Sequence, residues 1–330
     1  MVTRDKRLRW RILAGAVLLA AVLAGVGVWR LHGTRPKPIT SVRVAAIQCY
    51  SVMGKTEHNR DRLTWLIRQA AAEGARIVVT PECAVQGYAY PPTWLTWSTE
   101  TGAADTMPVA EFAETVPGPS TEYFRQLASE LGIYLCLGLV EQSDGRFYNS
   151  QILLAPDGTL AAHHRKRELW PPGDGPWCTE GDLPPQVVHT PYGRLGLMIC
   201  YDFHSLPEAL ARDRADIVLY SVGWYGPNEK DWFTRQFPRK VVIPYGFAVV
   251  AANWCGLHND DEWPGRGCSC VIARDGTVLA LATRNSGEEV VLADLPVHCD
   301  ASTAGRRRQI GSREQRRGDQ PVATAGSPRR

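Results

Sequence analysis

Three side chains that could support nucleophilic chemistry each lie at or just past the end of an apolar run typical of a buried strand. They are Glu82, Lys166 and Cys200. Ligand sites in α/β folds gather at strand ends, so one site could contain all three. A thiolate is a nucleophile, a desolvated carboxylate accepts protons, and an ammonium group stabilises a developing oxyanion. The combination is suited to covalent catalysis by the thiol.

Each of the three also has an ordinary interpretation when the few residues around it, its sequence window, are considered alone. Glu82 could be a loop glutamate, and Lys166, which lies in HHRKRELW, could belong to a solvated basic patch. Cys200 could be one more buried cysteine, since this residue type is commonly buried. These short segments therefore indicate a site only when they are considered together with the surrounding elements and with their order along the chain.

The elements that must position these residues alternate between strands and helices. Apolar runs predict strands over Val42–Gln48, Arg76–Thr80, Ile133–Val140, Leu195–Ile199, Ile217–Ser221, Phe247–Asn253 and Val290–Asp294. Turn signals predict two hairpins, Tyr148–Leu154 with Thr159–His164 and Cys270–Ala273 with Val278–Ala282. Helical spacing covers Glu57–Ala75, Thr121–Leu131, Pro207–Arg214 and Lys230–Val242. This pattern indicates one layered α/β domain with mixed sheets.

The three windows together resemble the nitrilase superfamily of carbon–nitrogen hydrolases. The resemblance rests on Glu82 in TPECAVQGY, Lys166 in HHRKRELW and Cys200 in LGLMICYDFHSLPEALARDRADIVLYSVGW, in this order. The opening VRVAAIQ, a YNS stretch before the first hairpin, VVAANWCG and the closing CSCVIARDGTVLA are similar to the family as well. The resemblance runs from about residue 42 to residue 295, which is nearly the whole central block.

The resemblance implies an α/β fold, a four-layer α-β-β-α sandwich, that forms homodimers or higher homo-oligomers and uses no metal and no organic cofactor. It implies that Cys200 attacks the substrate carbon and that Glu82 moves the thiol proton to the leaving amine. Lys166 and the backbone N–H of Tyr201 would stabilise the tetrahedral oxyanion. The expected partner is a small-molecule substrate with an amide-like bond: an amide first, and a carbamoyl compound or a nitrile less so.

One departure from the family concerns a second glutamate that many members carry after the lysine. The nearest equivalent here is Asp174, which is one methylene shorter than glutamate. Either this aspartate changes how substrate is positioned, or Glu180 or Glu168 takes the position instead. The difference bears on substrate choice more than on the three residues named above.

Aromatic residues near the three windows could line a substrate pocket, together with Asp174. Tyr88 follows Glu82, Trp177 follows Lys166, and Trp224 follows the strand after Cys200. The chain has 11 tryptophans, so some of them must belong to the core. Core packing and pocket lining both stay open for each of these residues.

Other functions are compatible with parts of the pattern. The same three residues could transfer an acyl group to an amine, as the membrane-bound lipoprotein acyltransferases of this superfamily do. Those enzymes have several membrane spans, whereas this chain has one apolar segment. A catalytically silent, anchored binding module would not need Glu82, Lys166 and Cys200 together. A papain-like protease is disfavoured because its histidine follows the cysteine, whereas His163 and His164 precede Cys200.

The N-terminal region predicts one transmembrane helix before the catalytic domain. Residues 12–29 contain no charge and are preceded by basic residues, which favours a single-pass anchor with the domain outside the cytoplasm at the cell membrane. A cleaved secretory signal is the alternative. The predicted organisation is an anchor or signal segment over 1–33, a linker over 34–41, the hydrolase domain over 42–298 and a basic disordered tail over 299–330.

Composition excludes several classes of protein. Hydrophobic residues make up 44% and charged residues 22%, which is typical of a globular protein. The formal net charge of +3 arises from basic ends around an acidic centre, so no nucleic-acid partner is expected. Nine cysteines occur without a CxxC pair, so no metal site is predicted, and an odd number leaves at least one unpaired within the chain.

Overall fold

A computed structural model describes residues 39–88, 95–102, 105–224, 229–256, 267–284 and 287–297. The predicted membrane segment at 12–29 and the predicted basic tail lie outside these residues. In the part of the chain that is described, no helix is long and apolar enough to cross a membrane.

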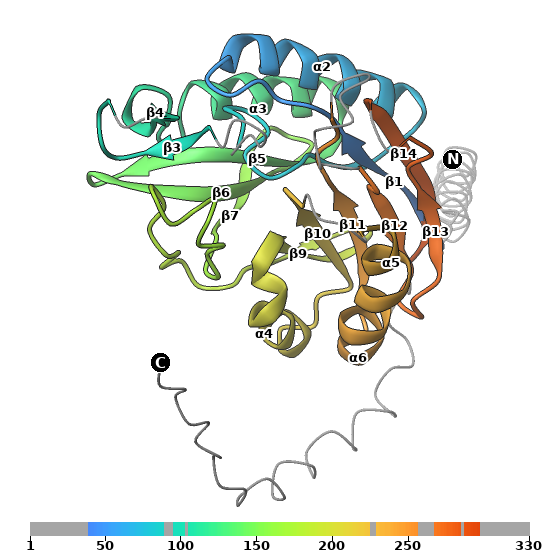
Figure 1. The fold of residues 1–330 in the computed structure, drawn as a ribbon. Coiled ribbons are helices and arrows are strands. Elements are labelled where there is room, and N and C mark those ends of the chain that lie inside the picture. Colours follow the sequence, from blue (N-terminus) through green and yellow to red (C-terminus); the bar gives the residue numbers. More distant parts are fainter. Residues whose placement is uncertain are drawn as a thin grey trace, which may run out of the picture. The chain divides into compact units, whose positions relative to one another are not determined.

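The strands of the described residues form two six-stranded sheets and one two-stranded ribbon (Figure 1). Sheet 1 has the order β14 (Glu289–Pro296), β1 (Ser41–Gln48), β2 (Ile77–Val79), β5 (Tyr134–Ser143), β6 (Arg146–Leu154) and β7 (Leu160–Arg165). Sheet 2 has the order β13 (Val278–Leu281), β12 (Cys270–Ile272), β11 (Ala248–Ala252), β10 (Ile217–Ser221), β9 (Gly193–Ile199) and β8 (Val187–Thr190). The ribbon pairs β3 (Thr96–Ser98) with β4 (Thr106–Pro108).

Each sheet has a parallel centre. In sheet 1, β2 is parallel to both β1 and β5, and in sheet 2, β10 is parallel to both β9 and β11. The outer strands pair antiparallel with these centres, as the two predicted hairpins require. The carboxyl ends of parallel neighbours meet at one sheet edge, which is where the sequence places its reactive residues.

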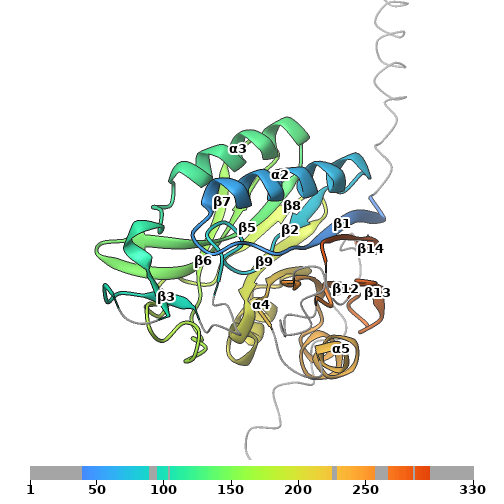
Figure 2. The same ribbon diagram turned by 45° about the horizontal axis from the view of Figure 1, so that its top comes forward.

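Helices cover the outer face of each sheet. On sheet 1 lie α2 (Thr56–Ala72) and α3 (Pro119–Leu131), and on sheet 2 lie α4 (Leu206–Arg212), α5 (Glu229–Asp231) and α6 (Ile243–Tyr245). Figure 2 shows the two pairs of layers from a second direction. Short 3₁₀ helices span Val109–Glu111 and Cys200–His204. Helix α3 ends at Gly132, whose φ of +64° is the left-handed conformation that glycine favours.

Alternation along the strands divides their side chains between separate cores. In β1, Val44 and Ala46 pack between the two sheets, whereas Ala45 and Ile47 pack against the helices of sheet 1. Strand β10 behaves in the same way, with Leu219 between the sheets and neighbouring side chains under the helices of sheet 2. Successive strand residues point to opposite faces, so each sheet buries one face against the other sheet and the other face against helices. Two sheets covered in this way give four layers. The predicted α-β-β-α sandwich is confirmed.

The helix predicted over Lys230–Val242 differs in detail. It begins at Glu229 as α5, widens into two π-helical segments, Trp232–Gln236 and Pro238–Val242, and ends as α6. Pro238 has no backbone N–H to donate to the preceding turn, which accounts for the irregular hydrogen bonding at this position.

Polar side chains tie the two sheets together next to the strand ends. The Gln151 amide on β6 donates to the carbonyl of Leu219 at 3.1 Å and to the hydroxyl of Ser221 at 2.8 Å. Ser221 in turn donates to the carbonyl of Thr80 at 2.7 Å. These buried bonds fix the carboxyl end of β2 against the end of β10, and residues from both sheets can therefore meet in one site.

Candidate active site

Buried charges gather where β2 and β7 end. Glu82 lies three residues after β2 and Lys166 directly follows β7, and neither side chain is exposed to solvent. The Lys166 ammonium donates to Glu82 Oε1 at 2.6 Å and to Asp174 Oδ2 at 2.7 Å. Burial of the three charged groups is tolerated because the Lys166 ammonium is paired and hydrogen-bonded with both carboxylates.

Two neutral donors complete this arrangement. The Asn149 amide on β6 donates to Glu82 Oε1 at 2.7 Å and to Asp174 Oδ1 at 3.1 Å. The Tyr88 hydroxyl donates to Asp174 Oδ1 at 2.8 Å. We refer to Glu82, Lys166, Asp174, Asn149 and Tyr88 as the charged cluster.

One carboxylate oxygen of the charged cluster is left without a partner. Within the described residues, Glu82 Oε2 is buried and accepts no hydrogen bond. A Cβ atom on Gly223, just beyond β10, would lie 2.7 Å from this oxygen, so only glycine lets the sheet 2 backbone approach it so closely. The free oxygen of Glu82 therefore points toward the part of the site that sheet 2 builds.

The pKa shifts in the cluster have identifiable causes. Burial raises the pKa of Glu82; the Lys166 charge opposes this rise and the Asp174 charge adds to it. Burial lowers the pKa of Lys166, but the charges of Asp174 and Glu82 outweigh it and hold the pKa well above its ordinary value. Lys166 is thus a permanent cation, and Glu82 is a stronger base than an exposed glutamate.

Cys200 begins the 3₁₀ helix that follows β9, in a turn we call the thiol turn (residues 199–204). Its backbone φ is +40°, which is uncommon for a residue with a side chain, and its exposure is 6%. The Tyr220 hydroxyl donates to the Cys200 carbonyl at 2.9 Å. Surrounding structure has to hold this strained turn, because an isolated chain would relax it.

The thiol of Cys200 lies close enough to the charged cluster to be influenced by it. Burial raises the pKa of Cys200, the Glu82 charge raises it further and the Lys166 charge opposes the rise. The resting thiol is therefore protonated, and a base must remove its proton before it can act as a nucleophile. The structure brings together Glu82, Lys166 and Cys200, the three residues selected from the sequence.

The structure selects among the sequence candidates for the second acidic residue. Asp174 is fully buried and binds Lys166, and its Oδ2 also accepts the Trp170 backbone N–H at 2.7 Å. Glu180 is exposed and Glu168 is only half-buried. Asp174 is therefore the acidic residue that joins the cluster. Its side chain, although shorter than that of glutamate, is long enough to pair with Lys166.

The aromatic candidates occupy different surroundings. Trp177 is 4% exposed, and its indole N–H donates to the carbonyl of Gly173 at 2.8 Å, so it packs beneath the Asp174 turn. Trp224 is half-buried and stacks on Trp232 with ring centres 5.2 Å apart. The Tyr201 ring lies edge-on to His204, and the role of the Tyr201 backbone N–H stays a prediction.

A family model described as carbon-nitrogen hydrolase matches residues 43–302. The chain belongs to this carbon–nitrogen hydrolase family. The predicted enzyme class is thereby confirmed, a hydrolase of carbon–nitrogen bonds other than peptide bonds.

Individual relatives of this carbon–nitrogen hydrolase cover most of its length. An omega-amidase of Xenopus tropicalis is 31% identical over 290 residues, which cover 84% of this chain and 95% of the relative. An aliphatic nitrilase of Sinorhizobium fredii is 34% identical over 282 residues, covering 78% and 87%. The crystal structure of an amidase from Nesterenkonia sp. superposes with a TM-score of 0.65 at 22% identity, covering 80% of this chain and 93% of that one, and confirms the fold.

Sequence reasoning gave no role to Asn149, His164 or Asp202. Asn149 appeared only as part of the YNS stretch, and the other two lay inside windows chosen for their neighbours. Strand alternation could have indicated that Asn149 points inward, but nothing in the chain order indicates that it contacts two carboxylates.

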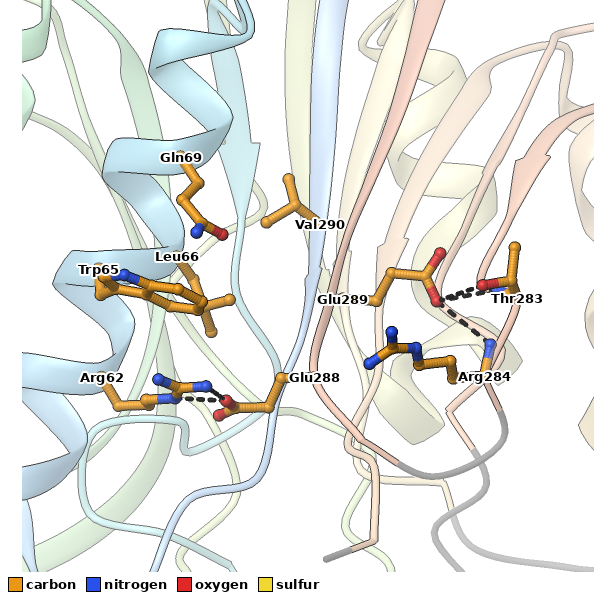
Figure 3. A pocket seen from close by; sticks show the side chains of 9 residues that line it. All are labelled: Arg62, Trp65, Leu66, Gln69, Thr283, Arg284, Glu288, Glu289 and Val290. Carbon is orange, nitrogen blue, oxygen red and sulfur yellow. Dashed lines mark hydrogen bonds and ion pairs between the residues drawn. The ribbon is translucent and has the colours of Figure 1, made fainter. Parts of the chain in front are cut away.

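A hollow lies between α2 and the connection from β13 to β14, away from the charged cluster (Figure 3). Its volume is about 370 Å³, and an ion pair between Arg62 and Glu288 lies on its wall beside the partly exposed ring of Trp65. None of the charged cluster lines it. Among the residues described, no group of three metal-ligating side chains comes together.

Proposed function

We propose that this enzyme hydrolyses small amides through a covalent thioester on Cys200, with Glu82 as the base and Lys166 as the oxyanion-stabilising cation. The observation that carries the proposal is the pairing within the charged cluster. It fixes one oxygen of Glu82 to Lys166 and Asn149 and leaves Oε2, on the side of Gly223, free to accept a proton.

The first half of the reaction forms the thioester. Glu82 Oε2 takes the thiol proton while Cys200 Sγ bonds to the amide carbon, whose oxygen becomes an oxyanion. Lys166 uses two of its N–H groups on Glu82 and Asp174, which leaves one for that oxyanion, beside the backbone N–H of Tyr201. Glu82 then passes its proton to the leaving nitrogen, the carbon–nitrogen bond breaks and ammonia leaves.

The second half returns the enzyme to its starting state. Water loses a proton to Glu82 as its oxygen bonds to the thioester carbon, and the same cation stabilises the second oxyanion. The carbon–sulfur bond then breaks, the thiolate regains the proton from Glu82 and the carboxylic acid leaves. The raised pKa of Glu82 suits a group that must both accept and return a proton.

Relatives support an amide as the substrate. Several similar proteins are named omega-amidases, and one is named a formamidase. In a structurally similar Nesterenkonia amidase, the acetamide moiety of fluoroacetamide is added covalently at the active-site cysteine. An aliphatic nitrilase is also among the relatives, so nitriles are the second substrate class to assay.

The test compares the full-length wild type with Cys200→Ala and, as a matched control, Cys136→Ala, which removes a buried thiol between the sheets. Ammonia release is measured with formamide, simple aliphatic amides, ω-amides of dicarboxylic acids, carbamoyl compounds and nitriles. We expect release from amides by the wild type and by Cys136→Ala and none by Cys200→Ala.

Equal release by Cys200→Ala would refute the thioester route. Wild-type release from nitriles alone would refute amide specificity, and N-acyl product formed from added amine, without acid product, would favour acyl transfer.

A further inference from the structure

Two neighbouring histidines of β7 each bind a carboxylate, on opposite faces of the strand. His163 Nε2 lies 2.7 Å from Glu141 Oε2, and its side chain is 18% exposed. His164 Nε2 lies 2.7 Å from Asp202 Oδ2, and these side chains are 2% and 0% exposed. Because strand residues alternate in direction, only His164 faces the thiol turn.

Asp202 is the acceptor for groups that flank both reactive residues. Its Oδ1 accepts the backbone N–H of Arg167 at 2.8 Å and of Glu168 at 3.0 Å, directly after Lys166. Its Oδ2 accepts His164 and also the backbone N–H of Ile199 at 3.1 Å, directly before Cys200. One buried carboxylate therefore ties the segment around the cation to the segment around the thiol.

We propose that the His164–Asp202 pair is a positioning clamp that sets the placement of the thiol turn relative to Lys166. The inference rests on the proposed roles of Cys200 and Lys166. The strained φ of +40° at Cys200 needs external support, and the two bonds from Asp202 to the segment after Lys166 cross from sheet 2 to the end of a sheet 1 strand.

The clamp should affect the rate because the Cys200 thiol and the Lys166 ammonium must both be correctly placed around one substrate carbonyl when the thiol attacks. A displacement of about 1 Å between reacting groups can cost on the order of 100-fold in rate. Substrate binding depends less on this separation, so loss of the clamp should lower kcat more than it raises KM. Simple alkylation of the thiol needs no oxyanion donor and should also suffer less than turnover.

The histidine doublet supplies matched variants. His164→Leu removes the donor to Asp202, His164→Gln keeps an N–H near the position of Nε2, and His163→Leu removes the equivalent donor on the other face. Asp202→Asn preserves shape while replacing one acceptor oxygen with a donor, and it serves if His164→Leu does not fold. Each full-length variant is measured for amide kcat and KM, for the rate of Cys200 alkylation by iodoacetamide, and for its thermal midpoint.

We expect His164→Leu and Asp202→Asn to lose about 10- to 100-fold in kcat, with KM and alkylation changed by no more than about threefold. His164→Gln should recover most of the loss, and His163→Leu should stay within about threefold of the wild type. Equal kcat for His164→Leu and His163→Leu, no recovery with His164→Gln, or losses in kcat and alkylation that follow the unfolded fraction would each overturn the clamp. If Cys200→Ala is as active as the wild type, the proposed function fails instead.

Discussion

The two sheets contribute halves of the site that are built on different principles. On the side of sheet 1, Lys166 pairs with both Glu82 and Asp174 through short, buried hydrogen bonds. On the side of sheet 2, Cys200 lies in a strained turn and its thiol is kept protonated by burial. One half is therefore a network of buried charges paired through side-chain hydrogen bonds, whereas the other is a single reactive group in a turn that the Asp202 carboxylate and the Tyr220 hydroxyl hold in place.

In the proposed mechanism, the two halves have different functions: one stabilises the oxyanion and the other supplies the nucleophile. Charges that are already paired need little reorganisation when an oxyanion forms beside them, which is the basis of electrostatic preorganisation. A neutral thiol can remain buried until a substrate arrives, because it carries no charge to be solvated. The protein thus places the charges of the cluster on the side of sheet 1 and the thiol, which would become charged only transiently, on the side of sheet 2.

The largest effect should come from removing the cation of the sheet 1 half with Lys166→Met. This change leaves Glu82 and Asp174 as unpaired buried carboxylates, so we expect stability to fall by about 3–5 kcal/mol. Amide hydrolysis should fall by about 10³-fold because the oxyanion loses its cation. Steady-state kinetics and urea unfolding measure the two losses. Arg167→Met, at an exposed neighbouring position, should change neither. A loss of activity below tenfold for Lys166→Met would contradict the proposed oxyanion role of Lys166, and unchanged stability would contradict the pairing of the buried charges.

A smaller and more specific effect is expected from Asp174→Asn. Burial raises the pKa of Glu82, and the Asp174 charge adds to that rise, so removing this charge should lower the pKa of Glu82. In the proposed mechanism Glu82 must be ionised to accept the thiol proton, so activity should be lost as pH falls through its pKa. The acid limb of the kcat/KM profile should move to lower pH, together with a fall in kcat of about 10- to 100-fold.

The control for that profile is Asp182→Asn, which removes a largely exposed carboxylate that pairs with Arg165 outside the cluster. Its acid limb should coincide with that of the wild type. An acid limb that moves to higher pH in Asp174→Asn would mean that Asp174 supports Glu82 mainly through Lys166 rather than by direct repulsion.

The third variant, Trp177→Phe, tests whether the sheet 1 half uses this aromatic residue for packing. The change removes the indole bond to the Gly173 carbonyl and part of a buried ring, and we expect a stability loss of about 1–2 kcal/mol. KM should stay within about twofold of the wild type, because the ring lies beneath the Asp174 turn. Trp65→Phe, at a position 47% exposed, should cost less than about 0.5 kcal/mol. A KM rise without a stability loss would make Trp177 a substrate contact.

Sequence patterns predicted the strands that carry the site from apolar runs buried on both faces, as in β2 and β10, and from the turn signal between β6 and β7. They missed β8, whose residues Val187–Thr190 are only partly buried, and the three-residue strands β3 and β4. Short or half-exposed strands lack the periodicity on which such predictions depend.

The site was predictable where the resemblance to a known family selects a residue, and less so where geometry does. Glu82, Lys166 and Cys200 were selected by their order in matching sequence contexts, and Asp174 was one of three acids considered because many family members carry a second glutamate after the lysine. Asn149 and the His164–Asp202 pair depend on side-chain direction and on which strands face each other, and neither is encoded in local composition.

The smallest expected effect concerns the strain on the sheet 2 half. Glycine adopts a φ of +40° more readily than alanine, so Cys200→Gly should be more stable than Cys200→Ala by about 0.5–1 kcal/mol. At Cys136, within β5, the order should reverse, because glycine in a strand interior costs about 0.5–1 kcal/mol relative to alanine. Urea unfolding of the four variants measures both differences. If Cys200→Ala is as stable as Cys200→Gly, or more stable, the thiol turn is not strained, and the contrast between the two halves then rests on electrostatics alone.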